Sequence, residues 1–471
     1  MEVSPFTMES NLHQQLMTAE QISNLLAKDR QYVWHPFTQM KDYEQRDHVL
    51  IQRAEGIFLY DAWGRKYYDT VSSWWCNVHG HGHPRIKEAI HKQLHAFDHI
   101  MFSGLTHAPG ITLAERLVQL APEGLHKVFY SDNGSTAVEV ALKMSFQYWQ
   151  QVGNTTKTKF IYLEGSYHGD TLGAVSVGGV EQYHALFKPL LFHGYKMPAP
   201  DLRASGGHTL ADEAIVAELA LAPLRELLQL EAEQIAGIIV EPMLMGAGGM
   251  IMTPAHYLTE LRKLCSAHQI HLIADEVATG FGRTGTMFAC EHAGISPDIL
   301  CLSKGLTAGV MPLAATLCSD TIYAAFYDDY MTQKTFFHGH SFTGNPVACA
   351  VALASLEVFE EEAVLERIQL TIRALETALH GSGLAALPYV ANIRQLGLVA
   401  AFDLYEDAQR KMPFPPEKRI GAAIYEAGFE EGLILRPLGD TIYYWLPHCA
   451  TPEDVSDIVS RTLRVLNKVL G

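Results

Sequence analysis

Two segments decide the fold of this sequence: His271-Leu-Ile-Ala-Asp-Glu276 and Ile299-Leu-Cys-Leu-Ser-Lys304. In each, a short, mainly apolar run ends directly in polar or charged residues. Three further runs have the same character: Lys127-Val-Phe-Tyr130, Phe160-Ile-Tyr-Leu163 and Gly237-Ile-Ile-Val240. Apolar strands that alternate with helical segments form parallel sheets covered on both faces. The pattern therefore predicts that residues from about 110 to 320 form an α/β domain with a mainly parallel sheet.

The residues that follow these strands are the first candidates for chemistry, because such sheets bind ligands beyond the carboxyl ends of their strands. Asp275 and Lys304 both occupy such positions. Pyridoxal 5'-phosphate (PLP) needs a carboxylate that keeps its pyridine nitrogen protonated and an amine that forms the Schiff base. That amine must also act as a base, so burial should lower its pKa. Either residue alone is more often a solvent-facing charge, but the pair predicts a cofactor site.

A candidate phosphate site follows the run 127–130. Ser131-Asp-Asn-Gly-Ser-Thr136 leads directly into a helical pattern from Ala137 to Gln150. A helix that starts at such a turn presents free N–H groups and a positive dipole end to an anion, although an ordinary N-cap is the alternative. After the run 160–163, a glycine-punctuated loop carries Tyr167, whose ring could stack on a planar heterocycle or simply pack.

A longer motif resembles a known family. The run Ala274-Asp-Glu-Val-Ala-Thr-Gly-Phe-Gly-Arg-Thr-Gly285, followed by Pro297-Asp-Ile299 and Ser303-Lys-Gly-Leu306, resembles the signature of class III aminotransferases of PLP-dependent transferase fold type I. Five segments are similar to the members that act in biotin biosynthesis: Trp34-His-Pro-Phe-Thr38, Ser72-Ser-Trp-Trp75, Tyr167-His-Gly-Asp-Thr171, Phe288-Ala-Cys-Glu-His292 and His338-Gly-His-Ser-Phe342. The resemblance covers residues 30 to 450 or so.

The resemblance implies a domain organisation. Residues 76–344 would form the large PLP-binding domain and residues 345–471 a smaller α+β domain. Residues 1–75 would contribute to the small domain and to the active site.

It also implies roles for individual residues. The residues that would hold PLP within one chain are Gly134, Ser135, Tyr167, Asp275 and Lys304, of which Lys304, Asp275 and Tyr167 are the catalytic ones. His340 and Ser341 would reach the phosphate from the neighbouring subunit, so the resemblance implies an obligatory homodimer.

The implied reaction moves an amino group from S-adenosylmethionine to 8-amino-7-oxononanoate, giving 7,8-diaminononanoate. The residues that match substrate-pocket positions are Phe37, Trp74, Tyr167, Gly339 and Arg436. Arg436 suits the far carboxylate of the amino-oxononanoate, because a guanidinium binds a carboxylate bidentately.

Two residues depart from the family pattern. Ser341 replaces a common threonine, which is conservative, whereas Phe37 stands where members that use S-adenosylmethionine usually carry tyrosine. Phenylalanine offers only an apolar wall and would leave a buried polar partner unsatisfied, at about 1–3 kcal/mol. Trp74 and Trp75 argue the other way, since aromatic walls suit an adenine ring or a sulfonium cation. S-adenosylmethionine is the preferred donor and L-lysine the alternative.

Other functions fit parts of the sequence. An ω-aminotransferase of diamines or β-amino acids, or a PLP isomerase such as an aminomutase, would share the fold. Ala174-Val-Ser-Val-Gly178 approximates the nucleophile elbow of serine hydrolases, which requires a strand before the serine and a helix after it. His79, His81 and His83 alternate with glycine, but no carboxylate or cysteine is spaced to complete a metal site, so we predict solvated histidines and no metal.

The composition excludes several classes of partner. With 471 residues, 48% hydrophobic, the sequence predicts a soluble globular protein, and the family resemblance implies small-molecule substrates. A net charge of -17 without a basic run argues against nucleic acid. No apolar stretch is long enough to span a bilayer, and residues 1–20 have neither secretory nor transit features, so we expect no membrane partner and a cytoplasmic location. Seven scattered cysteines without a CxxC pair predict buried, reduced thiols.

Several elements are predicted outside the sheet. Thr18 and Gln21 have capping-box spacing ahead of a helix, and residues 56–60 and 66–69 predict a hairpin. We predict a loop at residues 197–206, helices at 211–233 and 346–362, a strand at 393–402, and a last helix that begins at Pro452.

Overall fold

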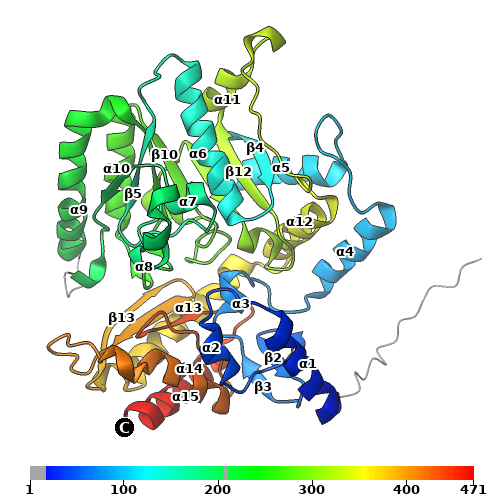
Figure 1. Cartoon of the computed structure of the whole chain (residues 1–471), viewed down its shortest axis with the longest axis vertical. Coiled ribbons are helices and arrows are strands. Elements are labelled where there is room, and N and C mark those ends of the chain that lie inside the picture. The colour runs from blue at the N-terminus through cyan, green and yellow to red at the C-terminus, as the bar shows by residue number, and fades with distance from the viewer. Residues whose placement is uncertain (1–16, 205–209) are drawn as a thin grey trace, which may run out of the picture.

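The computed structural model describes residues 17–204 and 210–471. Residues 1–16 of the N-terminal stretch predicted to lack secretory and transit features, and residues 205 and 206 of the loop predicted at 197–206, therefore lie outside the described residues. Figure 1 shows a large α/β part with a smaller part below it, and both ends of the described chain lie in the smaller part.

A seven-stranded sheet forms the centre of the large part, in the order β4-β12-β11-β10-β7-β5-β6. Its strands are β4 (Leu125–Ser131), β12 (Ala314–Ser319), β11 (Ile299–Leu302), β10 (His271–Asp275), β7 (Ile235–Val240), β5 (Lys159–Leu163) and β6 (Tyr195–Met197). The strands from β11 to β6 pair in parallel, whereas β12 is antiparallel to both of its neighbours. The predicted mainly parallel α/β sheet of fold type I is thus confirmed, with β12 and β6 as strands that the sequence patterns did not reveal.

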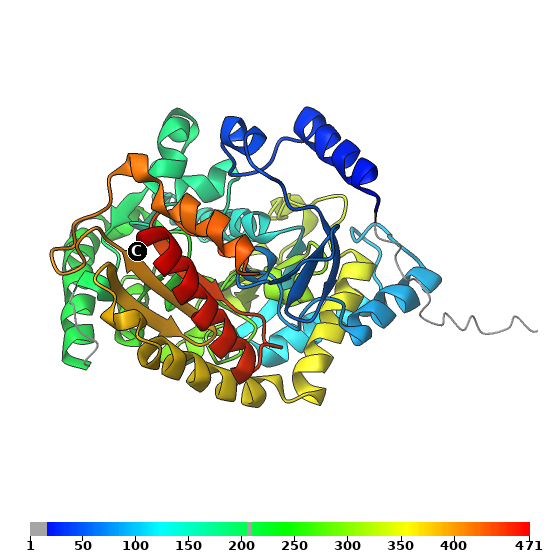
Figure 2. The ribbon, with the colours of Figure 1, turned by 90° about the horizontal axis from the view of Figure 1, so that it is seen from below.

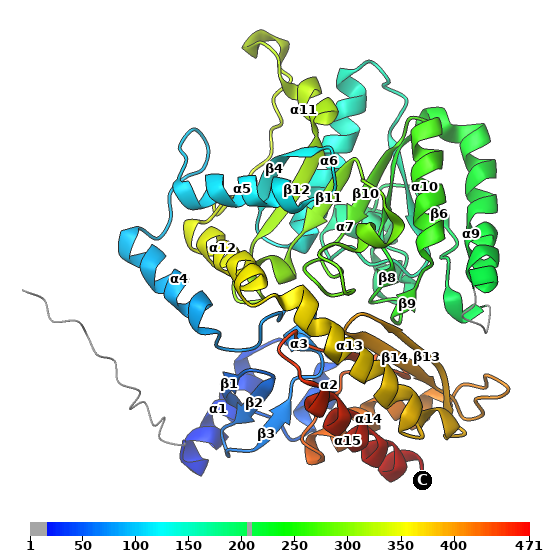
Figure 3. The same cartoon turned by 180° about the vertical axis from the view of Figure 1, so that it is seen from behind.

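Helices cover both faces of this sheet, which explains why its strands are apolar throughout. Along β10, Ile273 packs in one buried cluster with residues of α6 (Gly134–Gln151), and Leu272 packs in another with residues of α9 (Leu210–Glu231) and α10 (Ala255–Ala267). The helix α12 (Pro346–Glu361) packs against both α4 (Pro84–Ala96) and α5 (Ala108–Leu120), and Figure 3 shows these three helices on one flank of the large part.

The smaller part combines segments from both ends of the chain. Its three-stranded antiparallel sheet comprises β13 (Val390–Leu396), β14 (Val399–Leu404) and β15 (Thr441–Trp445). The helices α13 (Val364–Gly381), α14 (Ile420–Glu430) and α15 (Pro452–Leu470) pack on it, and Figure 2 shows α14 and α15 on its outer side. The single strand predicted at 393–402 is wrong, because the chain reverses at Gly397, which has a φ of +56°, in an otherwise apolar run.

The N-terminal elements lie beside this sheet. They are α1 (Ala19–Tyr32), α2 (Met40–Glu44) and a sheet of β1 (Ile51–Glu55), β2 (Phe58–Asp61) and β3 (Lys66–Tyr68). The capping box of Thr18 and the hairpin of β2 and β3 are as predicted. Backbone hydrogen bonds join the two ends of the chain, from Tyr68 N to Gly432 O (2.9 Å) and from Trp445 N to Thr70 O (2.7 Å).

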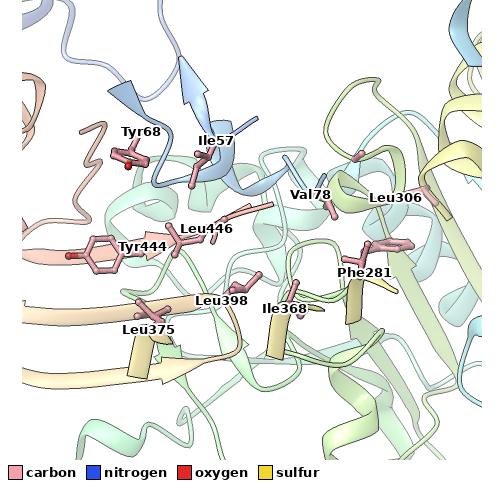
Figure 4. Close-up of a cluster of buried hydrophobic side chains, with 14 of the residues drawn as sticks. Ile57, Tyr68, Val78, Phe281, Leu306, Ile368, Leu375, Leu398, Tyr444 and Leu446 are labelled. Atoms are coloured by element: carbon pink, nitrogen blue, oxygen red, sulfur yellow. The ribbon is translucent and has the colours of Figure 1, made fainter. Parts of the chain in front are cut away.

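One buried cluster continues between the two parts. Figure 4 shows it running from Tyr68 and Tyr444 in the smaller part to Phe281 and Leu306 beneath the large sheet. The predicted helix 346–362 is present as α12, but it packs mainly on α4 and α5 of the large part. The domain limits at residues 75 and 344 stay predictions. Within the described ranges, no helix has both the length and the apolar character needed to cross a membrane.

Candidate active site

A cavity of about 480 Å³ lies at the carboxyl ends of the parallel strands. Its wall is formed by Trp75, Asn133, Gly134, Ser135, Tyr167, His168, Gly169, Asp170, Thr171, Glu241, Asp275, Val277, Ala278 and Lys304. The five residues predicted to hold PLP within one chain, which come from four different strand ends, therefore meet in one cavity, as expected for this type of sheet.

The amino terminus of α6 forms one end of the cavity. The Asn133 side chain caps the helix by accepting a hydrogen bond from Thr136 N (3.1 Å), and Ser135 Oγ lies 2.6 Å from Thr171 Oγ1. Gly134 is required here, because a Cβ atom would lie only 2.5 Å from Val277 Cγ1. The free N–H groups, the hydroxyls and the dipole of this 18-residue helix fit a phosphate group.

Asp275 and Glu276 point to different surroundings. Asp275 is buried at the cavity, where its Oδ2 lies 2.6 Å from His168 Nδ1 and its Oδ1 accepts a hydrogen bond from Val277 N (3.1 Å). Glu276 turns away and accepts hydrogen bonds from Ala289 N (2.7 Å) and Cys290 N (2.8 Å). Of the two carboxylates at the carboxyl end of β10, only Asp275 can therefore meet a ligand in the cavity.

Lys304 lies in the same cavity, and its amine is 5.0 Å from the centroid of the Trp75 ring. Burial lowers the pKa of Lys304, while the charge of Asp275 opposes this shift. A buried amine with a lowered pKa is suited to act as a base. Its backbone φ of 45° is in the left-handed region, a strained conformation that is common at functional sites.

Glu241 is a cavity residue that the sequence reasoning missed. It follows β7 directly, so the rule that pointed to Asp275 and Lys304 would have found it. Its two carboxyl oxygens accept hydrogen bonds from Tyr167 N (2.9 Å) and Gly246 N (3.1 Å). Burial raises the pKa of Glu241 to about 7. The Tyr167 hydroxyl donates to Asp170 Oδ2 (2.8 Å), and burial also raises the pKa of Tyr167.

A second cavity, of about 1020 Å³, brings together three of the predicted substrate residues, Phe37, Trp74 and Arg436. The Arg436 guanidinium lies 4.4 Å from the centroid of the Trp74 ring, and the rings of Trp74 and Phe37 form a T-shaped pair with 5.7 Å between centroids. The guanidinium is thus stacked on an aromatic wall of a cavity large enough for a substrate.

Trp74 and Trp75 belong to one short turn, α3 (Ser72–Trp75), and face different cavities. In the sequence, Trp75 is part of a motif and, with Trp74, is expected as an aromatic wall for the donor, but the structure places it in the wall of the first cavity. Its burial between Lys304 and Trp445, whose ring is stacked at 5.0 Å between centroids, could not be read from the doublet alone.

The segment 339–341 lies elsewhere in the described chain. Gly339, His340 and Ser341 line neither cavity, and His340 Nδ1 lies 2.9 Å from Asp132 Oδ2. The Ser341 carbonyl accepts a hydrogen bond from His99 Nε2 (2.8 Å). The roles implied for these residues stay predictions.

The geometry contradicts the hydrolase alternative. Ser176 is the last residue of a short helix, α7 (Leu172–Ser176), and its hydroxyl donates to Leu172 O (2.7 Å), so the strand that must precede a nucleophile elbow is missing at this point.

The three glycine-flanked histidines have separate partners. Their Nε2 atoms lie 3.0 Å from Ser355 Oγ for His79, 2.9 Å from Asp69 Oδ2 for His81 and 3.0 Å from Glu362 Oε1 for His83. His79 is buried rather than solvated as predicted. The described residues contain no cluster of three or more side chains that could hold a metal ion.

Comparisons with known proteins agree with this geometry. Residues 40–466 match the family Aminotransferase class-III. The chain is 46% identical to the adenosylmethionine-8-amino-7-oxononanoate aminotransferase of Geobacter sulfurreducens, over 94% of this chain and 97% of the relative. The crystal structure of the enzyme of the same name from Methanocaldococcus jannaschii superposes with a TM-score of 0.89 at 40% identity, covering 95% of this chain and 99% of that one. An amine transaminase from an uncultivated Pseudomonas species, solved in its PLP-bound form, gives a TM-score of 0.86 at 34% identity, covering 93% and 98%.

Proposed function

This chain belongs to the class-III aminotransferases, and on that premise we propose that it transfers an amino group from S-adenosylmethionine to 8-amino-7-oxononanoate. The product is 7,8-diaminononanoate, an intermediate of biotin biosynthesis. The enzyme is a transaminase whose cofactor is PLP.

The first cavity fits this cofactor. When bound, PLP supplies an electron sink for the charge left on the carbon beside the substrate nitrogen. We assign its phosphate to Gly134, Ser135 and the amino terminus of α6. Asp275 would hold the proton on the pyridine nitrogen, and His168, 2.6 Å away, would orient that carboxylate. Tyr167 would cover one face of the ring.

Lys304 would attach the cofactor and move the proton in each half-reaction. The Lys304 amine is buried and its pKa is lowered. At neutral pH it can therefore accept a proton from carbon more readily than the amine of an exposed lysine. The donor would pass its amino group to the cofactor and leave before the acceptor takes up that group, so the reaction would be ping-pong.

The observation that carries the substrate proposal is the pairing of Arg436 with Trp74 at 4.4 Å, next to the cofactor cavity. A guanidinium binds the far carboxylate of the amino-oxononanoate, while Trp74 and Phe37 cover its hydrocarbon chain. The name of the Geobacter relative supports both the acceptor and S-adenosylmethionine as the donor. L-lysine stays the alternative donor, because Phe37 lacks the hydroxyl of the usual tyrosine.

We also propose a cytoplasmic homodimer with shared active sites. Large apolar side chains are exposed on two segments of the large part, at Met101 and Leu105 and at Tyr330, Met331, Phe337 and Phe342. Exposed apolar surface of this kind is typical of a subunit interface. In such a dimer, His340 and Ser341 would serve the neighbouring subunit's phosphate.

The donor is tested by mixing the PLP form with one amine at a time and following the absorbance of the bound cofactor. We expect conversion to the pyridoxamine form by S-adenosylmethionine. Conversion by L-lysine and not by S-adenosylmethionine would refute the proposed donor. In that case Phe37→Tyr, which restores the usual hydroxyl, should shift the donor preference toward S-adenosylmethionine. Conversion by simple diamines or β-amino acids, without amination of 8-amino-7-oxononanoate, would favour an ω-aminotransferase. This function is the second candidate, and the similarity to the Pseudomonas amine transaminase supports it.

A further inference from the structure

The turn that carries the two tryptophans has an unusual backbone. Four successive residues, Ser72, Ser73, Trp74 and Trp75, have φ values of 48°, 45°, 73° and 70°, and none of them is glycine. The left-handed region is unfavourable for each such residue, because its Cβ crowds the backbone. A run of this kind persists only where the surrounding structure holds it in place, and it is a frequent mark of a functional site.

The most extensive hold on this turn comes from Asp69, which is 1% exposed. Its Oδ1 accepts a hydrogen bond from Ser73 N (2.9 Å), and its Oδ2 accepts one from Ser73 Oγ (2.7 Å). The same Oδ2 lies 2.9 Å from His81 Nε2, so the ring of His81 fixes the carboxylate from the other side. The Ser72 hydroxyl adds a hydrogen bond to Trp445 O (2.5 Å).

The conformation of the turn decides where the two rings point. Trp74 is 39% exposed and faces the second cavity beneath Arg436, whereas Trp75 is 6% exposed and faces Lys304. Trp75 is anchored independently by a hydrogen bond from its Nε1 to Tyr443 OH (3.0 Å). Trp74 makes no such hydrogen bond in the described chain, so its position depends on the backbone at Ser73.

We propose that Asp69 is a positioning residue that, through Ser73, holds Trp74 against Arg436 and thereby sets the specificity of the substrate cavity. Asp69 and Ser73 line neither cavity, so the effect is transmitted through the turn. The proposal rests on the proposed function only in taking the second cavity as the substrate site.

A matched pair of variants at position 73 tests the proposal. Ser73→Ala removes the hydroxyl contact with Asp69 but keeps the Cβ that disfavours the left-handed backbone. Ser73→Gly removes the same contact and also removes the Cβ. We expect Ser73→Ala to raise the KM for 8-amino-7-oxononanoate about tenfold, as a misplaced substrate contact does, with kcat changed less than about twofold. Ser73→Gly should recover most of that loss and should have the higher melting temperature of the two.

Two outcomes would overturn the proposal. A KM of Ser73→Ala equal to that of the wild type would mean that the contact with Asp69 is dispensable. A Ser73→Gly variant no better than Ser73→Ala would mean that the hydroxyl itself, rather than the backbone conformation, matters. Asp69→Asn provides a second measurement, because asparagine has one acceptor oxygen where the carboxylate uses two, one for the Ser73 N–H and one for the Ser73 hydroxyl, and it should follow Ser73→Ala in KM.

Failure of the proposed function would look different. If the wild type does not aminate 8-amino-7-oxononanoate, the same KM comparison is made with the acceptor that it does use. The order of melting temperatures is independent of any substrate.

Discussion

Replacing Glu241 by glutamine would separate the two contributions of this buried carboxyl group to stability. Both oxygens of Glu241 accept backbone N–H groups, those of Tyr167 and Gly246. Glutamine has only one acceptor oxygen, so one buried N–H group loses its partner, at a cost of about 1–3 kcal/mol. This loss should be independent of pH.

The second contribution depends on pH. Burial raises the pKa of Glu241 from 4.5 to about 7, so the folded protein holds this proton more tightly than the unfolded chain does. The resulting stabilisation is fully present below pH 4.5 and is lost as the pH rises through about 7. At 1.36 kcal/mol per pKa unit, the loss between pH 5 and pH 8 is about 2–3 kcal/mol. Glutamine carries no such proton.

Urea unfolding of the wild type and of Glu241→Gln at pH 5 and pH 8 measures both contributions. We expect the variant to be less stable than the wild type at pH 5 and as stable or more stable at pH 8. Glu276→Gln is the matched control, because burial also raises the pKa of Glu276 to about 7. It should show the same dependence on pH but keep its turnover, whereas Glu241→Gln should lose turnover because the N–H groups of Tyr167 and Gly246, which now have one carboxyl oxygen each, would compete for a single acceptor oxygen. A stability difference that is equal at the two pH values would refute the reasoning.

Three further variants test the assigned chemistry. Lys304→Ala should abolish turnover, and borohydride should no longer fix the cofactor to the protein, as a mass measurement would show; cofactor fixed at another lysine would contradict the assignment. Asp275→Asn keeps the shape but removes the charge, so turnover should fall by several orders of magnitude while the cofactor stays bound, and a mild effect would mean that another group holds the pyridine proton. Arg436→Lys replaces a planar bidentate donor by a single ammonium, so kcat/KM for the amino-oxononanoate should fall about tenfold or more with little change for a substrate that lacks the carboxylate. Equal losses for both substrates would argue against a carboxylate contact.

The central strands were predictable because each is a buried apolar run, and buried parallel strands need no alternation. The edge strand β6 has only three residues, Tyr195–Met197, and its half-buried pattern carries no such signal. The reversal at Gly397 was missed because the residues on either side are apolar, with Leu396 and Leu398 next to the glycine. Tertiary packing, which a local pattern cannot contain, decided these cases.

In the candidate site, too, the residues placed by strand topology could be predicted, whereas those placed by tertiary packing could not. Asp275 and Lys304 stand directly at strand ends, so the topology of the sheet was enough to bring them together. The partnership of His168 with Asp275 spans 107 residues and required the folded chain. The left-handed turn at Ser72–Trp75 could not be predicted either, because glycine is the usual sequence signal of a positive φ and Ser-Ser-Trp-Trp contains none.

The hydrogen bonds from the Ser72–Trp75 turn to β15 have a consequence for biosynthesis on the ribosome. Ser72 and Trp445 are 373 residues apart, so the tryptophan turn is released from the ribosome long before the strand that anchors it. At 5–20 residues per second, the wait is about 20–75 s. During this interval the N-terminal hairpin and the turn lack their neighbours in the small sheet, and their apolar side chains are open to chaperones. The catalytic pocket is therefore completed among the last steps of maturation, and nascent chains interrupted before β15 would carry most of the large sheet without a finished site.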